Sequence, residues 1–123
     1  MFFNEAIKPR ISELNENGRL SYEAILSILE TVGSHHSDCA NDNVVAGSNL
    51  GIAWLLVDWR VSILRHPTYD DTLKLTTWVR GKANAVSVYR DFAVNDDNGQ
   101  EMLRAEAKFC LVDIKTGMIK IRK

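Results

Sequence analysis

Only one stretch of this chain has the apolar spacing of a long helix, and it lies early, at residues 21–36. In "SYEAILSILETVGSHH" the apolar positions recur at helical intervals, with members at Leu20, Ala24, Ile25, Ile28, Leu29 and Val32. Ser21 is a suitable N-cap, and Glu23 is acidic in the first turn. Leu26 widens the apolar stripe, which predicts a helix buried over most of its circumference. Gly33 and the polar residues after it are expected to end the helix.

Most of the chain after residue 51 follows a period of two, which is typical of strands. We expect these strands at 52–66, 72–81, 85–95, about 100–112 and 118–121, with a short first strand within 7–20. Turn chemistry separates them, in "NENG", "PTYDD" and the Asn-Gly pair of "NDDNGQ", and residues 37–51 are expected to be a loop. One antiparallel sheet has one apolar face to cover, and the chain offers one helix. The sheet is therefore expected to wrap around that helix in an α+β fold.

Composition narrows the choice of partners and surroundings. A chain of 123 residues favours a single domain over residues 1–123. A net charge of −1 supplies no basic field for nucleic acid or anionic lipid, and no apolar run approaches the roughly 20 residues that span a bilayer. The two cysteines, Cys39 and Cys110, make no disulfide framework. We therefore expect a cytoplasmic protein with no nucleic-acid or membrane partner.

The segment "GIAWLLVDWRVSILRHPTYDDTLKLTTWVRG", followed by "YRDFAVNDDNGQEMLRAEAKFCLVDIKTGMIKI", resembles the acyl-ACP thioesterase family. The resemblance covers roughly residues 18–122 and implies the hotdog fold, an antiparallel sheet wrapped around one long central helix. That family hydrolyses fatty acyl thioesters on acyl carrier protein with two hotdog domains in tandem, and this chain looks like the first of them. The family's catalytic Asn and His lie in the second domain. No "NxH" pair occurs here, and "AKFC" at 107–110 stands where the family usually has Ser-x-Trp.

The resemblance implies a thioester hydrolase that acts on a fatty acyl-ACP or an acyl-CoA, without a cofactor. Because one hotdog builds half of the usual site, a homodimer or higher homo-oligomer is expected. A non-catalytic module that binds acyl thioesters is the main alternative. A hotdog hydratase or dehydratase is a weaker one, because it needs a histidine at the helix start, and the only histidines before residue 66 lie at the helix end.

The catalytic group is expected at the helix N-terminus, where backbone N–H groups can stabilise the thioester oxyanion. Relatives with one domain often carry an Asp just before the helix, and Asn15 lies at that place. Since Asn cannot ionise, the candidate base is Glu16 first and Glu30 second, with Asn15 orienting water or the thioester. Further carboxylate candidates are Glu13 and Glu23.

Residues expected to bind substrate surround the same helix start and include Asn17, Gly18, Arg19 and Tyr22. Gly18 also allows close approach of a ligand to the backbone. His35 and His36, at the far end of the helix, are expected to line the acyl or pantetheine channel only across a dimer.

The cluster "HHSDC" at 35–39 also raises the possibility of a metal site, since His35 and Cys39 are four residues apart. A zinc site needs at least three protein ligands, and His66 and Cys110 are isolated in the sequence, so no metal is expected. The default interpretation is a solvated helix end that chemistry does not need. Arginines on the strands are expected to pair with acids across the sheet, at positions 60, 65, 80, 90 and 104, or in a minority reading to contact a CoA phosphate or an acidic carrier protein.

Overall fold

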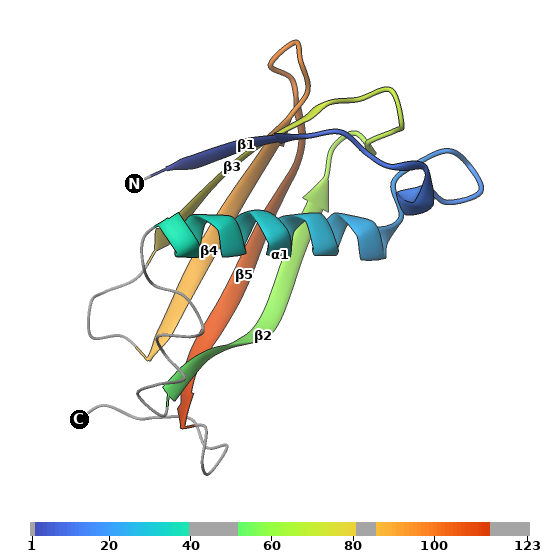
Figure 1. Cartoon of the computed structure of the whole chain (residues 1–123). Helices are drawn as coiled ribbons and strands as arrows, with labels where there is room; N and C mark the ends of the chain where they lie inside the picture. Colours follow the sequence, from blue (N-terminus) through green and yellow to red (C-terminus); the bar gives the residue numbers. More distant parts are fainter. Residues whose placement is uncertain (1, 40–51, 81–85, 114–123) are drawn as a thin grey trace.

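A five-stranded antiparallel sheet and one long helix make up the fold (Figure 1). The computed structural model describes residues 2–39, 52–80 and 86–113. The strand order is β1-β3-β4-β5-β2, so the first two strands in the sequence form the two edges. The elements are β1 (Phe3–Ile7), the 3-10 turn η1 (Ile11–Glu13), α1 (Tyr22–Cys39), β2 (Ile52–Ile63), β3 (Leu73–Arg80), β4 (Ser87–Asn95) and β5 (Glu101–Asp113).

The helix begins where the sequence predicts. The hydroxyl oxygen of Ser21 accepts the backbone N–H of Ala24 at 3.1 Å, and its carbonyl accepts that of Ile25 at 3.0 Å. The predicted end was wrong, because α1 continues through Gly33 to Cys39. Gly33 is buried against β4, and a Cβ atom there would lie 3.2 Å from Cδ of Arg90. This glycine therefore permits close packing inside the helix and does not terminate it.

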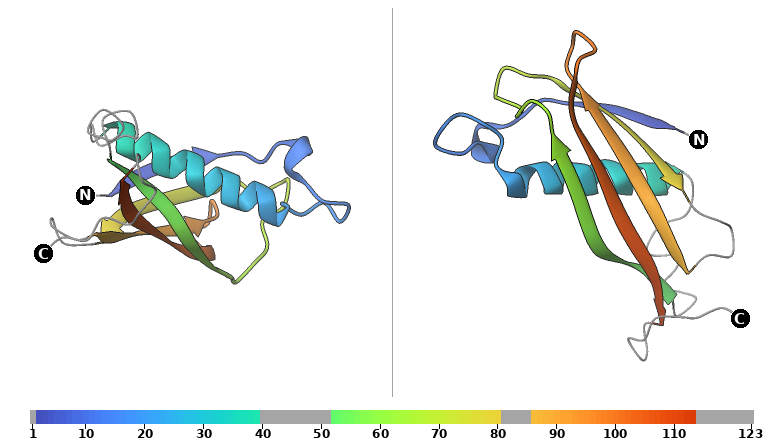
Figure 2. Two further views of the ribbon diagram at one scale, coloured as in Figure 1. Left: turned by 90° about the horizontal axis from the view of Figure 1, so that it is seen from below. Right: turned by 180° about the vertical axis from the view of Figure 1, so that it is seen from behind.

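One face of α1 packs on the concave side of the sheet, as Figure 2 shows from below. Its core side chains are those expected, with Ile25, Ile28 and Leu29 no more than 6% exposed. The prediction that the helix is buried over most of its circumference was wrong. A full polar face points away from the sheet and is exposed at Glu23, Ser27, Glu30, Thr31, Ser34 and His35. The wider stripe came from Leu26, which is only half-buried.

The strands alternate as predicted. Leu73, Leu75 and Thr77 of β3 face the helix and are buried. The alternate residues of β5 from Leu103 to Leu111 face the same way, and all of them are buried except Phe109, which is partly buried. The Asn-Gly hairpin joins β4 to β5, with Gly99 at a φ of 80° that favours glycine. Trp59 packs inward against Phe92 at 5.6 Å between ring centroids, while Trp78 contacts Phe2 on the sheet's other surface.

The N-terminal strand lies earlier than expected. β1 occupies Phe3–Ile7 and pairs with β3, where a strand was predicted to begin only at residue 7. The segment that follows is instead a 3-10 turn at Ile11–Glu13 and the predicted turn at 15–18. The loop predicted at 37–51 was wrong for residues 37–39, which belong to α1. Its remainder and the expected strand at 118–121 lie outside the described residues.

β2 is an edge strand that carries exposed apolar side chains. Leu55 and Val57 are about half-exposed near the irregularity that interrupts pairing with β5 between Leu56 and Asp58. An edge strand presents unpaired backbone donors and acceptors, and exposed apolar side chains add to its tendency to associate.

Candidate active site at the start of the helix

The turn before α1 is closed by Asn15. Its side-chain oxygen accepts the backbone N–H groups of Asn17 at 2.9 Å and Arg19 at 3.2 Å, and its own N–H donates to the Arg19 carbonyl at 2.7 Å. Gly18 takes a φ of 74° within this turn, a backbone angle that glycine adopts at little cost. The oxygen of Asn15 is therefore already committed to the backbone, which leaves its NH₂ group to meet a ligand.

The predicted carboxylates are exposed and lie apart from one another. Glu16 is at the tip of the turn, and Glu23 and Glu30 are on the outer face of α1, with no hydrogen bond or ion pair to any described residue. At 1.5 Å per residue, Glu30 lies about 12 Å along the axis from Tyr22. Glu13 differs, because it caps η1 by accepting the backbone N–H of Arg10 at 2.7 Å. Residues 15–22 therefore lie together at the helix start, whereas Glu30 lies away from it.

His66 also lies at the helix start, which the sequence did not reveal. Its Nε2 atom is 2.6 Å from the carbonyl oxygen of Leu20, and its ring meets that of Tyr22 edge-on at 5.6 Å. The backbone reinforces this contact, since the Leu20 N–H donates to the carbonyl of Pro67 at 2.9 Å and Arg19 bridges Thr68. The sequence analysis considered His66 only as a possible metal ligand and did not place it at the helix start. No local pattern marks a hydrogen bond between a side chain and a backbone carbonyl that lie 46 positions apart in the sequence.

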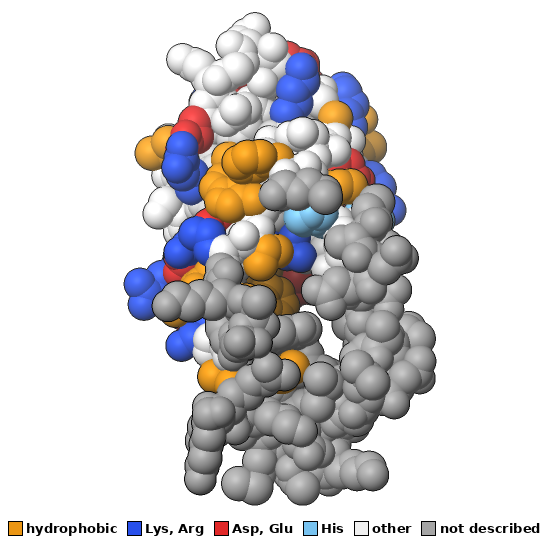
Figure 3. Space-filling view, turned by 90° about the vertical axis from the view of Figure 1, so that its left-hand side faces the viewer, with side chains coloured by type: hydrophobic (Ala, Val, Ile, Leu, Met, Phe, Trp, Pro, Cys, Tyr) orange, Lys and Arg blue, Asp and Glu red, His pale blue; other side chains and the backbone are white. Residues whose placement is uncertain are grey.

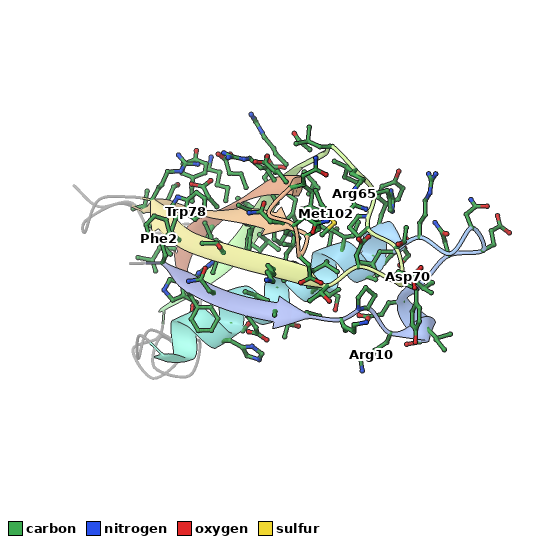
Figure 4. All side chains as sticks on the ribbon, turned by 90° about the horizontal axis from the view of Figure 1, so that it is seen from above. Phe2, Arg10, Arg65, Asp70, Trp78 and Met102 are labelled. Atoms are coloured by element: carbon green, nitrogen blue, oxygen red, sulfur yellow. The ribbon has the colours of Figure 1, made fainter. Side chains whose placement is uncertain are left out.

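An ion-pair network holds the β2–β3 connection that carries His66. Arg65 donates to both carboxylate oxygens of Asp71, at 3.2 and 3.0 Å, and to Asp96 at 3.0 Å. Asp71 in turn accepts the Thr68 N–H at 2.8 Å, and the hydrogen bond from Arg65 lowers the pKa of Asp71. Figure 4 labels Arg65 and Asp70, which both belong to this connection. These ion pairs and hydrogen bonds hold the β2–β3 connection, and with it His66, in place.

Apolar side chains beside His66 are exposed. Tyr22, whose ring meets that of His66, is 67% exposed, and Leu64, two residues before His66 in the sequence, is 68% exposed.

The opposite end of α1 has a different character. His36 is 6% exposed, its Nδ1 accepts a hydrogen bond from Arg90 at 2.7 Å, and Phe3 stacks on its ring. Arg90 also donates to Ser37 at 3.0 Å. Burial, and then the positive charge of Arg90, lower the pKa of His36. Arg90 points inward because it shares the face of Phe92 and Val94.

His35 lies on the exposed side of the same turn, where its Nδ1 is 2.7 Å from a carboxylate oxygen of Glu5 on β1. Figure 3, which views this end, shows a pale-blue histidine surface among hydrophobic and cationic side chains. This pair replaces the solvated helix end of the default interpretation with a contact between α1 and β1. Within the described ranges, no group of three or more His, Cys, Asp or Glu side chains could hold a metal ion.

The convex side of the sheet carries one arginine that pairs across strands as the sequence predicts. Arg80 on β3 bridges Asp91 on β4 and Glu106 on β5, and its guanidinium lies over the Tyr89 ring at 5.1 Å. The Asp91 carboxylate raises the pKa of Arg80. Arg65 and Arg104 also pair with acids, but not across the sheet: Arg104 pairs with Glu101 of its own strand, and Arg65 with Asp71 of the β2–β3 connection. No helix among the described residues is long and apolar enough to cross a membrane.

The chain has the hotdog fold, which is defined by this strand order and by one helix packed against the concave side of an antiparallel sheet. Within that fold the chain belongs to the acyl-ACP thioesterase family, because residues 1–121 match the family described as the acyl-ACP thioesterase N-terminal domain.

The individual proteins that resemble this chain share a quarter or less of its residues. The chloroplastic palmitoyl-acyl carrier protein thioesterase of Cuphea hookeriana is 25% identical over 123 residues, covering 94% of this chain and 29% of the relative. An acyl-ACP thioesterase structure from Bacteroides thetaiotaomicron has a TM-score of 0.90 at 16% identity, covering 98% of this chain and 49% of that one. A 1,4-dihydroxy-2-naphthoyl-CoA thioesterase from Synechocystis has a TM-score of 0.86 at 12% identity, covering 100% and 90%. The chain thus spans less than a third of its curated relative.

Proposed function

We propose that this chain hydrolyses a fatty acyl thioester carried by acyl carrier protein or CoA. The observation that carries the proposal is the family match over residues 1–121. The names of its relatives support it, since they describe thioesterases for both acyl carrier protein and CoA thioesters. We propose a cytoplasmic setting and no cofactor.

The chemistry is assigned to the start of α1. The first N–H groups of the helix, at Tyr22 and Glu23, have no acceptor within the helix, and the helix dipole is positive there. They would stabilise the oxyanion that forms at the thioester carbonyl. The neighbouring groups proposed to hold the substrate are the NH₂ of Asn15, the turn residues Asn17, Gly18 and Arg19, and the ring of Tyr22.

Glu16 remains the carboxylate proposed as base, because it lies in the turn that leads into the helix. Glu30, His35 and His36 are too far along α1 to act on the same carbonyl, with His36 about 21 Å from Tyr22 along the axis. Any role for these three in catalysis or substrate binding requires a second hotdog domain.

We therefore propose a homodimer or higher homo-oligomer. The exposed apolar positions on edge strand β2, Leu55 and Val57, support association along that edge. Sedimentation should show a dimer or larger species at micromolar concentration. A monomer with and without ligand would contradict the proposal.

Thiol release from a series of acyl-CoA and acyl-ACP substrates of different chain length tests the activity. Turnover of any of them above the uncatalysed rate supports hydrolysis. Saturable binding of the same thioesters without release of thiol would instead identify a binding module.

A further inference from the structure

We propose that protonation of His36 opens one corner of the fold, where the first residues of β1 separate from the last turn of α1. The corner consists of residues 2–4 and residues 36–39. The proposal goes beyond thioester hydrolysis and does not depend on it. It rests on a buried contact between an imidazole and a guanidinium, two groups that would both be cations in acid.

Arg90 determines which form of the His36 ring the closed corner accepts. A guanidinium can only donate hydrogen bonds, so Nδ1 of His36, 2.7 Å from a nitrogen of Arg90, must hold a lone pair and carry no hydrogen. Protonation of Nδ1 would remove this acceptor and place two cations side by side, where His36 is 6% and Arg90 8% exposed. Buried like charges are costly. The two side chains must therefore separate when the ring gains this proton.

The side chain that moves is His36, because Arg90 is held on several sides. Arg90 donates to the hydroxyl of Ser37 at 3.0 Å, and its Cδ packs closely against Gly33. Its strand, β4, is paired with β3 on one side and with β5 on the other. His36 instead lies in the last turn of α1, and the ends of helices open more easily than strands inside a sheet.

The first residue of β1 depends on the present position of the His36 ring. Phe3 stacks on that ring, with 5.4 Å between the centroids and 18° between the planes. β1 has five residues and is an edge strand that pairs only with β3 (Figure 1). The end of a short edge strand opens at little cost. Departure of the ring should consequently release Phe3 from its pairing with Thr77.

A second contact between the same elements limits the opening. Nδ1 of His35 lies 2.7 Å from a carboxylate oxygen of Glu5, two residues beyond Phe3 in β1. A protonated His35 can still bond to a carboxylate, so this contact persists in the acid that breaks the contact between His36 and Arg90. The remainder of β1 should therefore stay on β3 while the corner opens.

The charges that face His36 set the pH at which the corner opens. Among the described side chains, β4 brings the charge of Arg90, and β1 brings the uncharged Phe3 and the carboxylate of Glu5, which His35 engages. Burial, and then the positive charges of Arg90 and of the N-terminus, lower the pKa of His36. The ring regains an ordinary pKa of about 6.5 in the open form, so the ratio of open to closed forms should be constant above this pH. Below it, the ratio should rise by up to about tenfold per pH unit.

Amide hydrogen exchange of the full chain, followed by NMR between pH 7.5 and pH 5, tests the proposal. Protection factors correct for the intrinsic pH dependence of exchange and report the ratio of closed to open forms. For the amides that pair Phe3 with Thr77 and for those of the last turn of α1, they should be constant down to about pH 6.5. They should then fall by up to about tenfold per unit. They should also stay at least about tenfold below those of the pairing between β4 and β5, because the corner opens while the core remains closed.

Two neighbouring substitutions identify the group that binds the proton. His36→Gln keeps an oxygen acceptor for Arg90 but cannot gain a proton near pH 6, so protection at the corner should no longer fall with acid. His35→Gln is the matched control, since it removes the histidine one residue earlier. It should keep the fall at Phe3 and extend it to the rest of β1, because the contact with the Glu5 carboxylate is weakened.

Three results would overturn the proposal. Constant protection at the corner below pH 6.5 would show that His36 does not open it. Protection equal to that of the β4–β5 pairing would show that the corner opens only when the whole molecule unfolds. A fall that survives in His36→Gln, or one that His35→Gln abolishes, would assign the proton to another group. If His36→Gln does not fold, the wild-type and His35→Gln profiles still decide between these outcomes.

Discussion

The two ends of α1 each hold a histidine ring, yet the rings are bonded in opposite senses. At the far end, Nδ1 of His36 accepts from Arg90 inside the core. At the near end, Nε2 of His66 donates to a backbone carbonyl at a half-buried position. The first arrangement uses the lone pair of the imidazole to hold strand and helix together. The second uses a ring N–H to hold the β2–β3 connection to the helix start, so residue type alone does not predict how a histidine is bonded.

The largest expected effect concerns the apolar segment that links the two ends. Ile28→Ala removes a side chain that is 6% exposed and should lower the free energy of unfolding by about 2–5 kcal/mol. Urea denaturation measures this change. Ser27→Ala, on the exposed face one residue earlier, should stay within about 0.5 kcal/mol. Equal effects of the two would contradict the assignment of the buried face.

Acidification should weaken the far end first. The lowered pKa of His36 means that the unfolded chain binds a proton at higher pH than the folded one. Stability is therefore unaffected above about pH 6.5 and falls as the pH drops below it, by at most about 1.4 kcal/mol per pH unit. Urea midpoints between pH 8 and pH 5 measure this slope. His36→Gln keeps an acceptor for Arg90 and should flatten this slope. An unchanged slope would show that a group other than His36 binds the proton.

The near end should respond only in stronger acid. The lowered pKa of Asp71 contributes stability that is fully present above the ordinary aspartate value of about 4 and is lost as the pH falls through the folded value. Asp71→Asn should remove this acid-dependent loss while leaving the response near pH 6 intact. The same titration, continued to pH 2.5, checks the order of the two transitions. If the loss of stability that depends on Asp71 occurred at higher pH than the loss that depends on His36, the predicted order of the two ends would be wrong.

The smallest expected effect is at Gly33. An exposed helical Gly→Ala change stabilises by about 1 kcal/mol. Here the new Cβ would lie 3.2 Å from Cδ of Arg90, whose guanidinium is held by His36 and Ser37. Gly33→Ala should therefore gain clearly less than that amount. In an Arg90→Met background the gain should return, and a double-mutant cycle measures the difference.

Much of the fold could be predicted because it depends on local pattern. The start of the helix at Ser21 and the alternation of Leu73, Leu75 and Thr77 follow from side-chain period and capping. The end of the helix could not, because Gly33 and His36 are kept helical by contacts with Arg90 on a strand more than fifty residues later. Tertiary packing there outweighs the local signal of a glycine.

The turn at Asn15 and the N-cap at Ser21, which hold the candidate residues, could be predicted from local sequence. The residues that meet them from elsewhere in the chain could not. His66 was missed because its contacts depend on tertiary structure. Strand β2 leads the chain back to the helix start, where the Leu20 N–H donates to the carbonyl of Pro67. Asn15 was given the right place but not its turn-closing role, which depends on the backbone angles of the turn.

The strand order also has a consequence for synthesis on the ribosome. Strand β1 emerges first, but its partner β3 is made only after the helix and β2, and β2 itself waits for β5, the last described strand. At about 5–20 residues per second, these waits amount to several seconds during which the apolar face of α1 has no sheet to cover it. Folding of the chain should consequently depend on chaperones that bind the exposed apolar face, and it should be impaired when translation is slow before β5. The folded structure no longer exposes that face.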